Sequence, residues 1–213
     1  MICRWAAAWH APGRTPGADR RGQALVEMAL ILPVFLFIVL GTLELGFAFD
    51  HNLTLAYSSR EGARVGSAMV NGGGPLGCGS GQSPKAATVD PTIIAAVQRV
   101  LKSSGSPVLG HLNDVNEIRI YQATSSGAES GPVNRWIYAP GSGPVVDGTA
   151  LDFAPTSPQS WSACSRVNGN TPDSIGVSLS YTYRLQTPLS ALLGVITFGM
   201  NDRTVMAANP TPQ

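Results

Sequence analysis

The chain has 213 residues, of which 44% are hydrophobic and 13% charged, and its formal net charge at pH 7 is +1. The length leaves room for one ordinary domain and an anchor, and the near-balance of charge excludes the basic surface typical of nucleic-acid-binding proteins. The charge is unevenly placed, because residues 1–22 carry four arginines against one aspartate and an apolar run follows directly.

Residues 23–49 predict a single membrane-spanning helix that contacts lipid. The sixteen residues 28–43 contain no charge and would span about 24 Å as a helix. The hydrocarbon core of a bilayer is about 30 Å thick, so the flanking residues supply the remaining length. Because the arginines precede the run, the N-terminus is expected in the cytoplasm and the rest of the chain outside.

Three other interpretations fit the run less well. A cleaved secretory signal would need a shorter apolar core and a site with small residues. A twin-arginine signal is indicated only by Arg20 and Arg21, since Gly22 and Gln23 follow where apolar residues are expected. A core helix of a soluble protein would show an amphipathic stripe.

The helix is expected to continue to about Val70, where "NGGGPLGCGSGQSPK" ends it. Small residues recur every four positions at Ser59, Ala63 and Ser67, a spacing that allows close approach of another helix. An ordinary alanine-rich helix explains the same spacing. The predicted division is a basic cytoplasmic leader over 1–22, a transmembrane and projecting helix over 23–70, and an extracytoplasmic α+β domain over 71–213.

Several shorter elements are expected in the outer domain. Asp90 and Pro91 predict the cap and first turn of a short helix, whose apolar residues at 93, 94, 97, 100 and 101 share one face. "NEIRIYQA" predicts a strand, and "NRWIYAP" is a weaker candidate. "SIGVSLSYTYRLQT" alternates apolar and polar residues six times, which indicates a half-buried antiparallel strand.

The C-terminal part completes the expected fold. "TPLSALLG" predicts a short helix with Thr187 as its N-cap and Gly194 past its end, and "VITFGMNDRTVMAA" predicts a last strand. The preceding segment 139–173 is rich in Pro, Gly and Ser and predicts a long loop. Within it, Trp161 is either a contact residue or a cover for a small core. The fold class is therefore α+β, a long pilin-like N-terminal helix followed by a short helix and an antiparallel sheet.

The cysteines match this topology. Cys3 precedes the anchor, whereas Cys78 and Cys164 follow it, where an oxidising compartment would permit a bridge. The sequence predicts a Cys78–Cys164 disulfide, and two unrelated thiols are the alternative.

No catalytic constellation stands out. His10, His51 and His111 lie before the anchor, at its outer edge and in the outer domain, and no nucleophile elbow, phosphate loop or zinc motif occurs. We therefore expect no catalytic residues, no cofactor and no metal, and no enzymatic activity.

The head of the apolar run carries a pattern of its own. A glycine followed five positions later by glutamate, here Gly22 and Glu27, resembles type IV prepilins. "RRGQALVEMALILPVFLFIVLGTLELG" followed by "YSSREGARVGSA" resembles the TadE-like family of tight-adherence (Flp) pilus assembly proteins. Two features depart from such pilins: Met28 stands where Tyr or Phe often follows the glutamate, and the leader is long. The chain also exceeds the size of a major Flp pilin, so a minor pseudopilin or assembly component is the better match.

The resemblance implies cleavage by a prepilin peptidase between Gly22 and Gln23. It also implies that Glu27 pairs with the new α-ammonium of Gln23 on its own or a neighbouring subunit, and that the partners are other pilin-like subunits and the assembly machinery. The alternative is a permanently anchored single-pass surface protein that binds a ligand through the Trp161 loop and is never assembled into a pilus.

Overall fold

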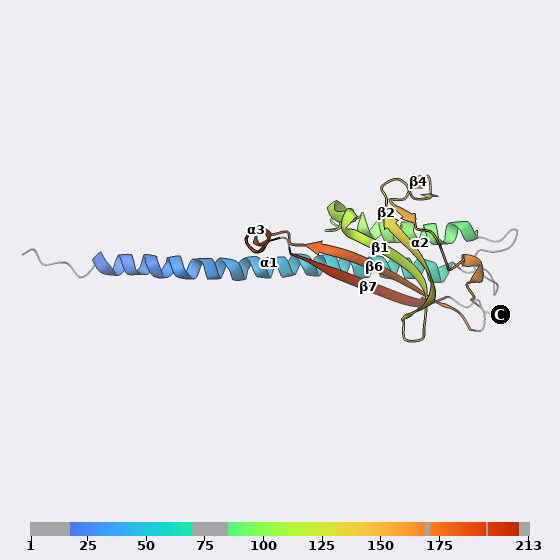
Figure 1. Ribbon diagram of the computed structural model, residues 1–213, viewed down its shortest axis with the longest axis horizontal. Coiled ribbons are helices and arrows are strands. Elements are labelled where there is room, and N and C mark those ends of the chain that lie inside the picture. Colours follow the sequence, from blue (N-terminus) through green and yellow to red (C-terminus); the bar gives the residue numbers. More distant parts are fainter. Residues whose placement is uncertain (1–17, 70–84, 169–170, 195, 209–213) are drawn as a thin grey trace, which may run out of the picture. The chain divides into compact units, whose positions relative to one another are not determined.

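The computed structural model describes residues 18–69, 85–168, 171–194 and 196–208 (Figure 1). Its contacts divide the chain into two compact units, Met1–Thr42 and Leu43–Gln213. The predicted leader over residues 1–22 lies largely outside the described residues.

The N-terminal helix α1 runs from Ala18 to Ala68 and includes Pro33, which confirms the predicted long helix. All residues from 22 to 39 are exposed. The helix is long and apolar enough to cross a membrane, and proline is tolerated in such helices. A helix that faces lipid keeps its apolar side chains free of contacts with the protein, and residues 22 to 39 meet this requirement within their own unit.

The larger unit, Leu43–Gln213, which we call the outer unit after the predicted topology, contains an antiparallel sheet with the order β5-β2-β1-β6-β7 (Figure 1). Its strands are β1 (Val115–Ala123), β2 (Glu129–Tyr138), β5 (Phe153–Pro155), β6 (Ser174–Arg184) and β7 (Thr197–Ala207). A hairpin of β3 (Val145–Val146) and β4 (Thr149–Ala150) stands apart. Both predicted strands of the first hairpin and the two C-terminal strands are confirmed, and so is the α+β class.

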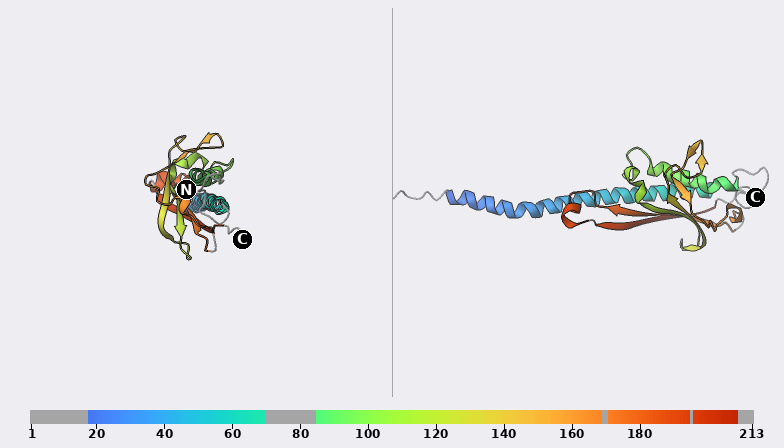
Figure 2. Two further views of the ribbon diagram at one scale, coloured as in Figure 1. Left: turned by 90° about the vertical axis from the view of Figure 1, so that its right-hand side faces the viewer. Right: turned by 45° about the horizontal axis from the view of Figure 1, so that its top comes forward.

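The part of α1 from Leu43 onward and α2 (Ala86–Leu101) lie side by side on one face of the sheet (Figure 2). The alternation of β6 explains this arrangement, since its apolar residues point to the helices and form much of the core, namely Ile175, Val177, Leu179, Tyr181 and Tyr183. The opposite face of β6 carries the half-buried Ser178 and Ser180. One face is therefore dry and the other wet.

Two predicted helix caps are wrong. Helix α2 begins at Ala86, so Asp90 and Pro91 lie inside it, and the Asp90 carboxylate instead forms an ion pair with Arg166 at 2.6 Å. Helix α3 (Leu189–Leu193) has Pro188 at its N-cap without a side-chain cap bond. The backbone N–H of Thr187 donates to Glu44.

The long predicted loop also contains regular structure, including β3 to β5 and the 3-10 helix η2 (Ala163–Ser165); a second 3-10 helix, η1 (Leu109–Asp114), precedes β1. Trp161 is 2% exposed and lies 4.3 Å from the Arg166 guanidinium that stacks on its ring. Its interpretation as a cover for the core is confirmed. Because Trp161 also lines a cleft, its interpretation as a contact residue stays a prediction.

Candidate functional site

The predicted processing and assembly residues lie in the first turns of α1. Gly22, Gln23 and Glu27 are exposed, and nothing lies within 4 Å of the position where a side chain on Gly22 would begin. Their roles in cleavage and pairing remain predictions.

Glu44 joins α1 to the C-terminal part of the sheet. Its side chain is 6% exposed and accepts hydrogen bonds from the Tyr183 hydroxyl at 2.5 Å and from the backbone N–H groups of Gln186 and Thr187, each at 2.9 Å. Three donors around one carboxylate satisfy its negative charge inside the protein. The sequence indicated only an acid at the end of the apolar run.

His51 lies two turns further along α1 and packs beside the residues that bond to Glu44. Its Nδ1 lies 2.8 Å from the Phe47 carbonyl oxygen, which can only accept, so Nδ1 carries a proton. In the neutral ring Nε2 then accepts from the Gln186 side-chain amide at 3.2 Å. The ring meets Tyr183 edge-on at 5.0 Å between centroids. Burial, followed by the bond to Glu44, raises the pKa of Tyr183, so its hydroxyl stays a donor.

Small residues let α1 approach both α2 and the sheet. A Cβ at Gly62 would lie 2.6 Å from Val97 of α2, and one at Gly66 would lie 3.1 Å from Ile93. Ser59 is fully buried and bonds to Asp202 and Thr204 of β7. Close approach to another helix therefore occurs at Gly62 and Gly66, whereas Ser59 and Ser67 of the predicted series contact β7.

The other side of α1 is apolar and uncovered within the outer unit. Leu45, Phe49, Leu53 and Tyr57 recur every four residues and are 63%, 67%, 52% and 59% exposed. We call them the outer stripe. A cleft lined by Leu45, Ala48, Phe49 and Asn52 lies along it. Apolar residues at helical spacing outside a core are typical of a surface that meets another helix.

Most of α1, including the outer stripe, resembles a known protein family. Residues 22–64 match the sequence model of the TadE-like protein family. The TadE-like segment contains Gly22 and Glu27 as well as Glu44, His51 and Gly62, so it includes both the apolar run and much of the surface that packs on the domain. No curated protein and no solved structure matches the chain.

The match confirms the resemblance of the N-terminal segment and indicates a protein associated with the Tad pilus. Together with the apolar helix it indicates a single-pass membrane protein. The TadE-like family is a pilus-assembly family and is not known for catalysis.

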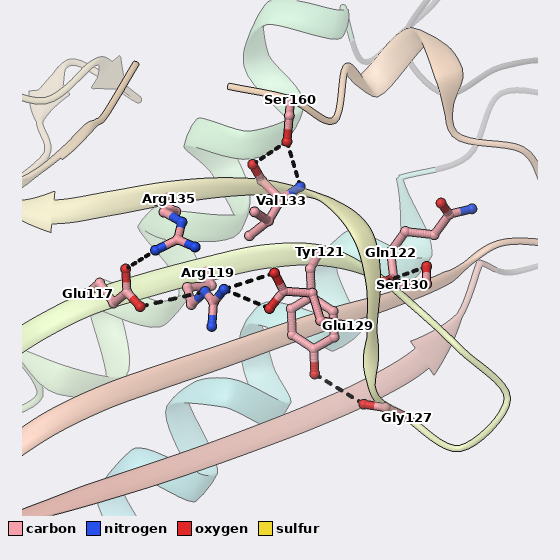
Figure 3. Close-up of polar contacts among 10 residues, drawn as sticks. All are labelled: Glu117, Arg119, Tyr121, Gln122, Gly127, Glu129, Ser130, Val133, Arg135 and Ser160. Atoms are coloured by element: carbon pink, nitrogen blue, oxygen red, sulfur yellow. Dashed lines mark hydrogen bonds and ion pairs between the residues drawn. The ribbon is translucent and has the colours of Figure 1, made fainter. Parts of the chain in front are cut away.

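The wet face of the sheet carries a charged groove of about 390 Å³, whose ion pairs are drawn in Figure 3. Arg119 contacts Glu129 at 2.7 Å and Glu117 at 3.5 Å, and Arg135 contacts Glu117 at 3.4 Å. These opposite charges pair with one another, so the groove is lined by a network of surface ion pairs. Among the residues that the structure describes, no group of three His, Cys, Asp or Glu side chains could hold a metal.

The predicted Cys78–Cys164 disulfide is not tested. Cys164 lies in η2, whereas Cys78 lies outside the described residues. The pairing stays a prediction.

Proposed function

We propose that the chain is a minor pseudopilin or assembly component of a bacterial tight-adherence (Flp) pilus, processed by a prepilin peptidase between Gly22 and Gln23. The observation that carries the proposal is the TadE-like match over residues 22–64. The arginines before the apolar run support an N-terminus in the cytoplasm and an outer domain beyond the membrane.

Glu27 supports an assembly role. A carboxylate at the centre of a membrane helix costs about 2.5 to 3.5 kcal/mol and less near the interface, so it needs a partner. Glu27 has no hydrogen bond or ion pair to any residue that the structure describes. Cleavage before Gln23 would create an α-ammonium group that can meet this carboxylate on the same or a neighbouring subunit.

The outer stripe offers a contact surface for the pilin-like subunits that the proposal requires. Its four residues continue the apolar character of α1 past Glu44, along a side that the sheet and α2 leave uncovered. A neighbouring helix would bury this stripe and gain about 25 cal/mol for each Å² removed from water.

Mass spectrometry of the N-terminus tests the processing step. After co-expression of the full chain with its cognate prepilin peptidase, we expect a mature protein that begins at Gln23. Gly22→Ala should block this shift in mass, whereas Gly41→Ala, a control in the same helix with nothing within 4 Å, should not. A mature protein that keeps Arg20 and Arg21 would overturn the processing proposal.

The alternative of a permanently anchored surface-binding protein has weaker support. It relied on the Trp161 loop, and Trp161 is 2% exposed beneath Arg166. The pilus-associated function therefore has the stronger support.

A further inference from the structure

A long uncharged segment connects β6 to β7. Between Arg184 and Asp202 the sequence reads "LQTPLSALLGVITFGMN" and contains no Asp, Glu, Lys or Arg. Helix α3 lies within it. This stretch combines the absence of charge with large apolar residues such as Leu193, Ile196 and Phe198.

Both ends of this segment return to Glu44. At its start, the backbone N–H groups of Gln186 and Thr187 donate to the Glu44 carboxylate. At its end, the ring of Phe198 packs 4.8 Å from the ring of Tyr183, whose hydroxyl donates to the same carboxylate.

Glu44 also marks a boundary in the sequence. It directly follows the charge-free run 28–43, which forms the centre of the predicted membrane span over residues 23–49. The bonds to Glu44 therefore hold the uncharged segment beside the outer end of that span.

The segment exposes large apolar side chains at this position. Leu193, Ile196 and Phe198 are 48%, 41% and 40% exposed, whereas Leu189 is buried. Gly194 ends α3 with φ of +84°, a value that favours glycine, and turns the chain toward β7. Single exposed apolar residues are ordinary, but three within six positions form a patch that calls for a partner.

We infer that the segment from α3 to the start of β7 rests on the lipid surface and buries Leu193, Ile196 and Phe198 among the headgroups and upper acyl chains. The inference rests on the proposed membrane anchoring of α1. A lipid surface is the partner because the segment is bonded to Glu44 near the outer end of the predicted span, and because an uncharged apolar patch enters the interface without desolvating any ion. The anchor holds this patch next to the bilayer, so weak insertion is sufficient.

Tryptophan quenching in vesicles tests the inference. Ile196→Trp is made in the full chain and reconstituted into phosphatidylcholine vesicles with or without brominated acyl chains, which quench tryptophans that reach them. Val167→Trp is the matched control. Val167 is also 41% exposed, but its N–H donates to Asp173 beside the first residue of β6, roughly 33 Å along the strand from Arg184. The emission of the native tryptophans is subtracted using the unsubstituted chain.

We expect the tryptophan at position 196 to lose most of its emission in brominated vesicles and the one at 167 to lose almost none. Equal quenching at the two positions would overturn the inference. Leu36→Trp, inside the charge-free run, separates this outcome from failure of the anchor. Quenching at 36 without excess quenching at 196 rejects only the lipid contact of the segment, whereas no quenching at 36 rejects the anchoring and the inference with it.

Discussion

The Tyr183 hydroxyl donates a 2.5 Å hydrogen bond to the Glu44 carboxylate and so connects β6 to α1 across 139 residues of sequence. The same carboxylate accepts two backbone N–H groups from the residues before α3. One buried acid therefore fixes the position of α3 relative to the part of α1 that belongs to the outer unit.

Tyr183→Phe should lower the free energy of unfolding of the outer domain by about 1.5 to 3 kcal/mol, the range for a lost hydrogen bond to a charged group. The measurement is denaturant unfolding of the full chain in detergent. Tyr57→Phe is the control, because Tyr57 is 59% exposed and its loss of a hydroxyl should change little. In a double-mutant cycle with Glu44→Gln the two effects should not add; simple additivity would argue against a direct bond.

Gly62→Val should destabilise the packing of α1 on α2. A Cβ alone would lie 2.6 Å from Val97 and 3.2 Å from Val177, so we expect a loss of about 1 to 3 kcal/mol from overpacking. Val97→Ala in the same chain should recover part of the loss by making room. Gly46→Ala, where nothing lies within 4 Å, should instead be neutral or stabilising by up to about 1 kcal/mol. A Gly62→Val chain as stable as the wild type would contradict the close packing.

Local sequence patterns correctly predicted the elements in which each residue meets the same surroundings as the other residues on its face. The six alternations of β6 match a strand with one dry and one wet face, and the apolar run of α1 needs only lipid on all sides. The caps at Asp90 and Thr187 were predicted wrongly. The Asp90 carboxylate pairs with Arg166, and the backbone N–H of Thr187 donates to Glu44, and both partners lie far away along the chain. Sequence spacing carries no information on such pairs.

The same limit applies to the candidate site. Gly22 and Glu27 could be singled out because their pattern lies within six residues. The bonding of Glu44 depends on Tyr183 and Gln186, and the need for glycine at position 62 depends on Val97. These requirements follow only from the packing of α1 against elements formed later in the chain. An acid directly after a charge-free run was the one available signal.

The Cys78–Cys164 disulfide predicts a specific peptide in a digest. The full chain, expressed with export to an oxidising compartment and digested without reductant, should yield a peptide pair containing these two cysteines, and reduction should separate it. When the chain is expressed without the prepilin peptidase it keeps Cys3 before the anchor; this cysteine should remain modifiable by a thiol reagent, which makes it an internal control. Recovery of Cys78 and Cys164 as separate, alkylated peptides from the exported protein would reject the pairing.

Asp152 predicts a pH dependence of stability. Its carboxylate accepts from Lys102 at 2.6 Å and from the Gly141 N–H at 3.0 Å, and the Lys102 ammonium, followed by the bond from Gly141, holds the pKa of Asp152 below its ordinary value. Since the folded pKa is depressed, the stabilisation is present above the unfolded pKa of about 3.9 and is lost as the pH falls through the folded value.

Lys102→Met should therefore lower the free energy of unfolding at pH 7 by less than about 1 kcal/mol, because the lysine is 41% exposed and solvent screens the pair. The difference from the wild type should shrink toward pH 2, where the carboxylate is protonated in both chains. Arg60→Met, which removes an exposed cation of α1, should show no such convergence. A deficit of Lys102→Met that is the same at pH 7 and pH 2 would mean that Lys102 stabilises the end of α2 through the packing of its methylene groups and not through its charge.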